Sequence, residues 1–595
     1  MMHRSIATVS LRGRLEDKLG AIAKAGFDGI ELFDNDLISS ELAPADVAAV
    51  CADLGLAIDL YQPVRDVEDV TPEAFATVER RLRHKFSVAS ALGAPVVLVC
   101  SNVSSAALGD AGVRAEQLHR VGELAADYGI SVAYEALAWG SRVNTLAQAW
   151  EAVCRADHEA LLVAVDTFHM LARGEGPEVL DRVPGSRIGF LQVADAPRLE
   201  MNLIEWSRHH RCFPGQGAFD VAGIVSAVLE RGYRGPVSLE VFSDVVREVP
   251  AEVTATDAMR SLVFLDDQLT GTLPAPIRAV PAFLEFFVPP QDGRVAGLLR
   301  QVGFVERGRH RTKPVTWWQA GEASILTNEQ QVERSGPRAI GLVTDSLEAV
   351  QGRASALRWP RPRRVRNEQE TLLPGITAPS GVHLFFSAQP GDEDYWRRDF
   401  EVTDETGAPP NLRFDHVGID VDPHRVDEEV FLYRSMMGLA PSPRQEFIQP
   451  DGRLQSMILG AAGRELAIVL NVSHVAASNA RPHGITQVAL ACEDVFETAA
   501  EMRRQGLELM PVPENYYADL AARLELPDEL LDRLRGSQLL YDADGHGGEL
   551  VHAYTAVQLG QFFFEILERR GGYEGYGTAN TGVRLAFQYS SVERQ

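Results

Sequence analysis

In residues 5–267, short apolar segments alternate with longer segments in which apolar and polar positions are mixed. Short apolar runs rich in β-branched residues predict strands, and the longer segments between them have the apolar period of helices. Strands are predicted at Ile6–Ser10, Gly29–Phe33, Ala57–Tyr61, Pro95–Cys100, Ile130–Tyr134, Leu162–Val165, Gly189–Val193 and Val237–Val241. Helices are predicted at Arg14–Ala25, Pro72–Leu92, Arg114–Tyr128, Leu146–Arg155 and Val221–Arg231.

Eight strands that alternate with helices over about 260 residues have the size and rhythm of a (β/α)8 TIM barrel. We therefore predict an α/β fold of this kind for residues 1–267. An open, doubly wound parallel sheet is the alternative. That architecture rarely needs eight regular units, and no GxGxxG motif follows the first strand.

The pattern changes after the predicted barrel. Residues 268–281, QLTGTLPAPIRAVP, are rich in Pro and Thr and predict a linker. Residues 282–595 then show short strands with few long helices, which is typical of an α+β fold. Units of βαβββ type start at Phe283, Ala339, Phe414 and Ile485, so this region is predicted to be an internal repeat. A charged break rich in Pro and Gly divides it into residues 282–387 and 412–595.

Composition and charge narrow the class of protein. The chain is 45% hydrophobic and 24% charged, as in ordinary globular proteins. Its net charge of −26 argues against a nucleic-acid partner, and without an apolar run of about 18 residues we expect no membrane span. Five scattered cysteines and an N-terminus without a signal-type apolar core favour the cytoplasm. The expected partner is a small-molecule substrate, with a homo-oligomer left open.

Polar side chains end four successive strands of the predicted barrel. They are Glu135, Asp166, Gln192 and Glu240, and parallel strands deliver such ends to one rim. Three of the four are formally anionic, so their repulsion in a partly buried site needs a compensating cation. An all-oxygen set suits a hard divalent ion, Mg²⁺, Mn²⁺ or Co²⁺, better than zinc. The alternative is that each carboxylate only caps a loop or pairs with an arginine.

Further candidates lie near this rim. His169 follows the sixth strand and is the candidate general base, unless it only packs. Arg65, in YQPVRD, could clamp a substrate carboxylate, unless it forms an exposed salt bridge. Ser207 and Arg211 occur in WSRHHRCFPGQG after the seventh strand, where we expect substrate contacts. Glu31 ends the second strand and is assigned a structural role.

Together with FPGQGAFD (Phe213–Asp220), the four predicted ligands resemble the xylose-isomerase-like barrel superfamily over residues 1–267. That superfamily includes sugar epimerases, hydroxypyruvate isomerase and 3-dehydroshikimate dehydratases. Many members carry a His at the position of Gln192, and a subset carries Gln.

The second half resembles the vicinal-oxygen-chelate fold, and more closely 4-hydroxyphenylpyruvate dioxygenase. The resemblance rests on FDHV (Phe414–Val417), FFFEILER (Phe562–Arg569) and a drifted C-terminal signature, YGTANTGVRLAF. It implies a metal site of His416, Gln487 and Glu565. Gln487 stands where the dioxygenase has its second His, which puts iron-dependent oxygenase activity in doubt and favours Mg²⁺. An active dioxygenase and a structural binding module remain the two alternatives for this half.

The pairing of these two halves resembles the fused bacterial 3-dehydroshikimate dehydratases. The resemblance implies a carbon–oxygen lyase of quinate and shikimate degradation that converts 3-dehydroshikimate to protocatechuate, with a metal-stabilised enolate and His169 as base. The alternative is an isomerase or epimerase of a sugar or hydroxypyruvate, in which Glu135 and Glu240 would act as opposed bases.

Overall fold

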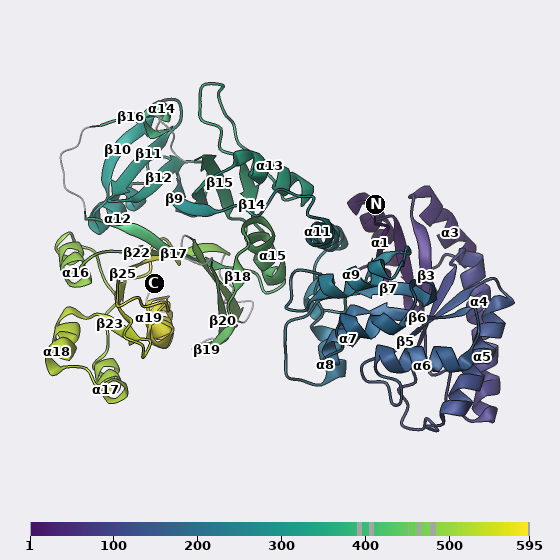
Figure 1. The fold of residues 1–595 in the computed structure, drawn as a ribbon. Helices are drawn as coiled ribbons and strands as arrows, with labels where there is room; N and C mark the ends of the chain where they lie inside the picture. Colours follow the sequence, from purple (N-terminus) through teal and green to yellow (C-terminus); the bar gives the residue numbers. More distant parts are fainter. Residues whose placement is uncertain are drawn as a thin grey trace. The chain divides into compact units, whose positions relative to one another are not determined.

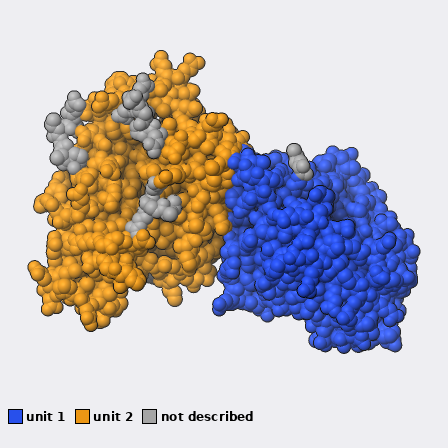
Figure 2. Space-filling view, in the orientation of Figure 1, with its two compact units in different colours: residues 1–273, 356–358 blue, residues 274–355, 359–595 orange. Residues whose placement is uncertain are grey.

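A computed structural model of the chain describes residues 2–388, 395–403, 410–449, 452–460, 466–475 and 483–592. The chain forms two compact units (Figure 2): residues 1–273 with 356–358, and residues 274–355 with 359–595. Of the predicted break between residues 387 and 412, positions 389–394 and 404–409 lie outside the described residues.

The first unit is a closed barrel of parallel strands in the order β1 to β8 (Figure 1). β1 pairs in parallel with both β2 and β8, and this closes the sheet. The predicted TIM barrel is therefore confirmed. The strands are β1 (Arg4–Ala7), β2 (Gly29–Phe33), β3 (Ala57–Val64), β4 (Val96–Cys100), β5 (Ser131–Glu135), β6 (Leu161–Asp166), β7 (Ile188–Val193) and β8 (Val237–Leu239).

Helices follow the strands and surround the barrel. They are α1 (Leu15–Ala25), α2 (Asp34–Ile38), α3 (Pro44–Asp53), α4 (Pro72–Leu92), α5 (Ala111–Ala126), α6 (Leu146–Ala156), α7 (Thr167–Ala172), α8 (Leu203–His209), α9 (Val221–Glu230), α10 (Asp244–Glu248) and α11 (Ala251–Thr270). Local chemistry sets their ends. The Asp110 carboxylate caps α5, and Gly26 ends α1 in the left-handed conformation that only glycine adopts without strain.

The barrel strands are apolar almost throughout because parallel strands are covered on both faces. Polar residues therefore appear mainly where the strands end. The strand register aligns these ends in two pairs of neighbouring strands: Cys100 is level with Glu135, and Asp166 is level with Gln192. The fold thus brings polar groups to one level of the rim before any loop contributes.

The carboxylate of Asp195 holds the long loop after β7 in place through hydrogen bonds. Asp195 accepts hydrogen bonds from the backbone N–H groups of Ala196, Gly215, Gly217 and Phe219 at 2.8–3.0 Å. A Cβ on Gly217 would lie 2.2 Å from Asp195 Oδ1, so this approach requires glycine. Paired backbone hydrogen bonds between Asp195 and Cys212 return the loop to the rim, next to the strand ends.

The second unit contains two mixed sheets in its described residues. The first has the order β14-β15-β13-β9-β12-β11-β10-β16. Its strands are β9 (Ala279–Val288), β10 (Val305–His310), β11 (Val315–Ala320), β12 (Ala323–Glu329), β13 (Gly336–Thr344), β14 (Gly375–Thr377), β15 (His383–Ala388) and β16 (Phe400–Val402). α11 and β9 both extend into residues 268–281, so the segment between regular elements is shorter than the predicted linker.

The second sheet has the order β18-β20-β21-β17-β22-β25-β24-β23, with β19 on β20. Its strands are β17 (Arg413–Asp420), β18 (Ala440–Pro441), β19 (Gln445–Gln449), β20 (Gly452–Gly460), β21 (Ala467–Val475), β22 (Gly484–Ala491), β23 (Leu540–Ala543), β24 (Glu549–Tyr554) and β25 (Phe563–Arg570). Curled mixed sheets of this kind confirm the predicted vicinal-oxygen-chelate-like fold.

The helices of the second unit are α12 (Arg294–Val302), α13 (Leu347–Ala356), α14 (Tyr395–Asp399), α15 (Val426–Met437), α16 (Val495–Arg504), α17 (Glu514–Arg523), α18 (Asp528–Ser537) and α19 (Thr581–Val592). Within the described part of the chain, no helix combines the length and the apolar character needed to cross a membrane.

Candidate active site

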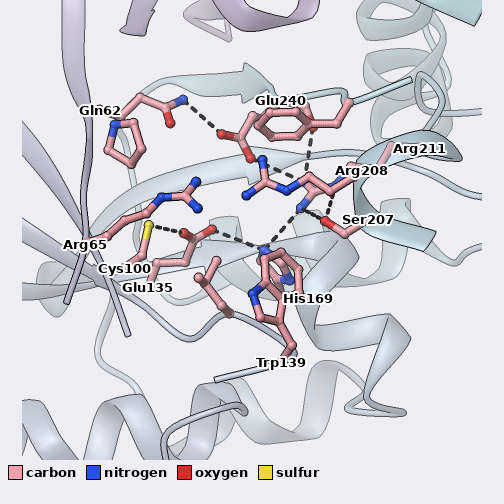
Figure 3. Close-up of a pocket in the computed structure, with 13 residues that line it drawn as sticks. Gln62, Arg65, Cys100, Glu135, Trp139, His169, Ser207, Arg208, Arg211 and Glu240 are labelled. Atoms are coloured by element: carbon pink, nitrogen blue, oxygen red, sulfur yellow. Dashed lines mark hydrogen bonds and ion pairs between the residues drawn. The ribbon is translucent and has the colours of Figure 1, made fainter. Parts of the chain in front are cut away.

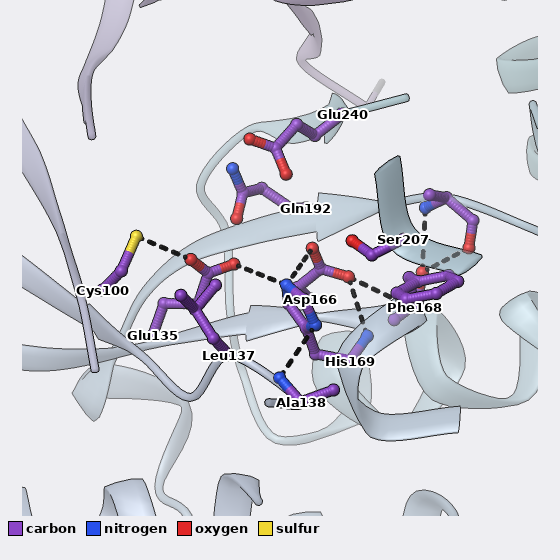
Figure 4. A network of polar contacts seen from close by, with 12 residues as sticks. Cys100, Glu135, Leu137, Ala138, Asp166, Phe168, His169, Gln192, Ser207 and Glu240 are labelled. Carbon is purple, nitrogen blue, oxygen red and sulfur yellow. Dashed lines mark hydrogen bonds and ion pairs between the residues drawn. The ribbon is translucent and has the colours of Figure 1, made fainter. Parts of the chain in front are cut away.

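The four strand-end residues of the barrel converge at its rim (Figure 4). Glu135 ends β5, Asp166 ends β6, Gln192 lies in β7, and Glu240 directly follows β8. Each residue is at most 4% exposed. The sequence pattern therefore grouped residues that the fold does bring together.

His169 joins this group through the start of α7. Asp166 Oδ1 accepts hydrogen bonds from the N–H groups of Phe168 and His169, so the carboxylate caps the helix and fixes the histidine beside it. His169 Nε2 lies 3.6 Å from Glu135 Oε1 and 3.7 Å from Asp166 Oδ2. Ligand atoms of Glu135, Asp166 and His169 all lie within 4.8 Å of one another, close enough to share a metal ion.

A chain of amides and carboxylates lies behind two of the predicted ligands. Gln192 Nε2 donates to Glu31 Oε2 at 2.7 Å. Gln62 Nε2 donates to the same oxygen at 3.0 Å and to Glu240 Oε1 at 2.9 Å. Glu31 is fully buried and lies at the rim itself.

Arg211 is buried among the predicted ligands. Its Nη1 donates to Asp166 Oδ2 at 2.9 Å and to Glu240 Oε2 at 3.3 Å, and its Nη2 lies 3.1 Å from His169 Nε2. Ser207 Oγ accepts from Nη2 at 2.9 Å, so the serine holds the arginine in place. Both residues reach the site as expected, but the described contacts of Arg211 are with protein groups.

Arg65 and Arg208 line a pocket at this rim, together with Gln62, Cys100, Glu135, Trp139, His169, Ser207, Arg211 and Glu240. Figure 3 shows the guanidinium groups of Arg65 and Arg208 pointing toward one another across this space. Neither side chain forms an ion pair or hydrogen bond with a residue that the structure describes. Arg208 instead lies over the rings of Trp139 and Phe242, 5.5 and 4.8 Å from their centroids.

Four of these residues, Gln62, Cys100, Trp139 and Arg208, were not singled out as site residues from the sequence. Gln62 lies near the C-terminal end of β3, three residues before Arg65, and a search for polar residues near strand ends could have found it. Arg208 stands between Ser207 and the candidate Arg211 in WSRHHR, but nothing in that run indicates which arginine faces the cavity. Trp139 carries no sequence signal that would separate it from a core residue.

Burial sets the electrostatics of the carboxylates. Burial and the neighbouring charges of Glu240 and Asp166 raise the pKa of Glu135 to about 8. Burial also raises the pKa of Glu240. Burial opposes the ionisation of Asp166 as well, but the Arg211 guanidinium and the backbone N–H of His169 outweigh it, and the pKa of Asp166 is lowered. Protein groups therefore do not fully compensate the negative charge that these carboxylates would carry if all of them were ionised.

The imidazole of His169 is held neutral. Burial, with the nearby positive charges of Arg211, Arg208 and Arg65, lowers its pKa to about 3. The N–H of Ala138 donates to Nδ1 at 3.2 Å, and Arg211 Nη2 lies near Nε2, so donors face both ring nitrogens. A neutral imidazole has one nitrogen that can accept a proton, as a general base requires, but the donors at both nitrogens and the nearby arginines oppose protonation of this ring.

The donor set fits a divalent cation. Three buried oxygens of the rim, Glu31 Oε1, Glu135 Oε1 and Gln192 Oε1, have no hydrogen-bond partner among the described residues. Buried polar atoms without partners are rare in proteins and often mark a site for an ion or water. The oxygens of Glu135 and Gln192, with the carboxylates of Asp166 and Glu240, form the hard, oxygen-rich set that Mg²⁺ and Mn²⁺ prefer.

A second cluster lies in the second unit, on three adjacent strands. His416 lies on β17, Gln487 on β22 and Glu565 on β25, and each is at most 6% exposed. His416 and Glu565 are both level with Ala489 in the strand register. A Cβ on Gly418, opposite Gln487, would lie 2.8 Å from the Gln487 Cβ, so glycine makes room for the amide.

The contacts of this cluster differ from those of the barrel. Gln487 Nε2 donates to Glu565 Oε2 at 2.5 Å, and His416 Nε2 lies 3.3 Å from the same oxygen. Burial opposes the charge on both ionisable groups. For His416, the hydrogen bonds and charges of Asp415 and Glu565 outweigh burial and raise its pKa to about 9. For Glu565, those of His416 and His552 outweigh burial and lower its pKa to about 2. His552 Nδ1, 2.6 Å from Glu565 Oε1, is a member that the sequence did not suggest.

Both units of the chain are similar to known proteins. Residues 19–265 match the xylose isomerase-like TIM barrel family. Over 98% of both chains, the protein is 40% identical to a 3-dehydroshikimate dehydratase of Pseudomonas putida and 39% identical to one of Pseudomonas aeruginosa. A solved structure of a xylose isomerase-like TIM barrel/4-hydroxyphenylpyruvate dioxygenase fusion protein is 38% identical, with a TM-score of 0.91 over 99% of both chains.

Similarity at this level extends across both units and so includes the barrel rim and the second sheet. The chain therefore belongs to the family of 3-dehydroshikimate dehydratases, carbon–oxygen lyases in which a xylose isomerase-like barrel is fused to a region resembling 4-hydroxyphenylpyruvate dioxygenase.

Proposed function

We propose that this protein dehydrates 3-dehydroshikimate to protocatechuate at the rim of its barrel, with a bound divalent cation. The observation that carries the proposal is the full-length similarity to two 3-dehydroshikimate dehydratases. The buried cluster of Glu135, Asp166 and His169 supports it, because this reaction needs both a base and stabilisation of negative charge. This similarity favours the lyase over the isomerase alternative.

Glu135, Asp166, Gln192 and Glu240 would hold the cation, which we propose to be Mg²⁺, Mn²⁺ or Co²⁺. When bound, it would supply electrophilic stabilisation for the charge that develops on the substrate ketone oxygen. Arg211 contacts two of these four residues, Asp166 and Glu240, and so limits their mutual repulsion. Its role is then to balance charge around the centre, beside any contact it makes with substrate.

His169 is the proposed base. In this substrate the proton to be removed lies on the carbon next to the ketone, and a hydroxyl leaves from the following carbon. The neutral imidazole of His169 lines the cavity and would take the proton, while the hydroxyl departs with its bonding electrons. The proton that His169 has taken is then returned to this hydroxyl, which leaves as water. A proton then leaves the remaining ring CH2 and one reaches the ketone oxygen, which makes the ring aromatic and favours the product.

Arg65 and Arg208 are proposed to bind the substrate carboxylate. Two guanidinium groups that face each other without an acidic partner repel one another, and an anion between them removes that repulsion. Arg211 was the other candidate for this contact from the sequence. Its guanidinium is already paired with Asp166 and Glu240, so Arg208 is better suited to bind an incoming carboxylate.

For the second unit we propose a second cation, Mg²⁺, held by His416, Glu565 and Gln487. The residue types support it, but the amide is turned the wrong way for a ligand, because Gln487 Nε2 donates to Glu565. A cation here requires the amide to turn and present its oxygen. With Gln in place of a second His the set is poor for iron, so we propose an assembly or regulatory role.

The direct test is conversion of 3-dehydroshikimate, followed by the ultraviolet absorbance of the aromatic product. We expect turnover with Mg²⁺ or Mn²⁺, and we expect His169→Ala to lower kcat by about 10²–10⁴-fold because the base is lost. The control is His84→Ala on the exposed face of α4, which should behave as wild type. Solvent deuterium entering unchanged substrate without loss of water would instead support the isomerase.

Arg65→Gln and Arg208→Gln should each raise KM by about 10–100-fold, the value of a lost charge-assisted hydrogen bond, and should change kcat less. Steady-state kinetics measure both constants. Arg155→Gln is the matched control, because Arg155 is an exposed arginine on α6 that pairs with Glu151. A wild-type KM in both cavity variants would exclude this carboxylate site.

Metal content should separate the two proposed sites. After chelation and reloading with Mn²⁺, we expect one ion at each site of the full chain, measured by elemental mass spectrometry. Asp166→Asn should lose the barrel ion together with dehydratase activity, whereas His416→Ala should lose the other ion and retain activity. If both variants keep the wild-type metal content, these residues are not the ligands.

A further inference from the structure

An amide metal ligand has an orientation problem that a carboxylate or an imidazole does not have. The two ends of the Gln192 amide have nearly the same shape, but only the oxygen can bind a cation, and the NH2 group would repel it. A centre that uses glutamine therefore needs another group to choose the orientation. In the barrel, the Gln192 Nε2 has a partner at 2.7 Å, Glu31 Oε2.

Glu31 reaches the site from β2, where it is the middle residue of the strand. Its side chain is fully buried, and its Oε2 accepts from two amides, Gln192 and Gln62. An acceptor oxygen at this position selects the NH2 end of both amides. As a consequence, the Oε1 atom of Gln192 points away from Glu31 and lacks a hydrogen-bond partner among the described residues.

The same oxygen also acts on a second predicted ligand. Gln62 Nε2, oriented by Glu31, donates to Glu240 Oε1 at 2.9 Å. This hydrogen bond occupies one carboxylate oxygen of Glu240 and leaves Oε2 to pair with Arg211. One chain of contacts, Gln192–Glu31–Gln62–Glu240, thus links ligands from β7 and the end of β8 through residues of β2 and β3.

We infer that Glu31 is a positioning residue for the metal centre, which turns the Gln192 oxygen toward the cation and fixes Glu240 through Gln62. The inference rests on the proposed function, because it assumes that the barrel rim holds a cation. Residues that orient metal ligands typically contribute about 10–100-fold to metal affinity. Glu31 would act without touching the cation or the substrate.

The test is the affinity for Mn²⁺, measured by calorimetry on the full chain. Glu31→Leu removes the acceptor oxygen at similar size and should weaken binding at the barrel site by about 10–100-fold. Glu31→Gln keeps an acceptor oxygen, so it should restore binding to within about threefold of wild type. Asp59→Asn is the control, since Asp59 is a mostly buried carboxylate of β3 that pairs with His3, away from the rim.

Two results would overturn the inference. One is wild-type affinity in Glu31→Leu, and the other is Glu31→Gln as weak as Glu31→Leu, because then the charge of Glu31 rather than its acceptor oxygen would matter. Gln62→Leu provides a variant that leaves Glu31 in place and should weaken binding by about tenfold if the link to Glu240 holds. Wild-type affinity in this variant would remove that link.

The experiment also separates this inference from the proposed function. Asp166→Asn identifies which binding event belongs to the barrel. If the wild-type chain shows no event that Asp166→Asn removes, the proposed metal centre itself fails. If that event is present and the Glu31 and Gln62 variants leave it unchanged, only the positioning role fails.

Discussion

The arrangement of the barrel rim follows from one constraint, which is the burial of several carboxylates in a small space. Glu31, Glu135, Asp166 and Glu240 are each at most 4% exposed. Carboxylates taken out of water need opposite charge or hydrogen-bond donors. Arg211 supplies the main positive charge within the cluster, and it pairs with Asp166 and Glu240.

That compensation is incomplete, and the remainder explains the other features. Glu135 keeps a raised pKa and an unpartnered oxygen, so the site retains capacity for a cation. Gln62 and Gln192 supply donors to Glu31, which Arg211 does not contact in the described hydrogen bonds. The positive charges of Arg211, Arg208 and Arg65 oppose protonation of His169. Of these three, Arg65 and Arg208 have no acidic partner among the described residues, so they could pair with an anion.

The two units use glutamine in opposite ways. In the barrel, Glu31 takes the NH2 end of Gln192 from behind, and the amide oxygen is free to face the centre. In the second unit, the NH2 end of Gln487 donates to Glu565, the residue with which it would share a cation. Both amides therefore donate to a carboxylate, but in the barrel that carboxylate is not a predicted ligand, whereas in the second unit it is.

The strand-end pattern predicted the barrel and the four converging residues because parallel strands necessarily deliver their ends to one rim. The spacing from Asp166 to His169 likewise follows from one helical turn. Contacts across the barrel could not be predicted in this way. Glu31 was assigned a structural role because its partners, Gln62 and Gln192, come from other strands. Arg211 was assigned to substrate because the sequence does not show how the loop after β7 returns to the rim. The pairing of Arg211 with Asp166 and Glu240 depends on that return.

The central claim is that the buried carboxylates and Gln192 form a centre for a divalent cation. Anomalous diffraction from crystals of the full chain soaked in Mn²⁺ tests it most directly. The account predicts an anomalous peak enclosed by oxygens of Glu135, Asp166, Gln192 and Glu240, with the Gln192 NH2 group still on Glu31. Absence of a peak at the barrel rim, or a peak that the Gln192 oxygen does not contact, would contradict it.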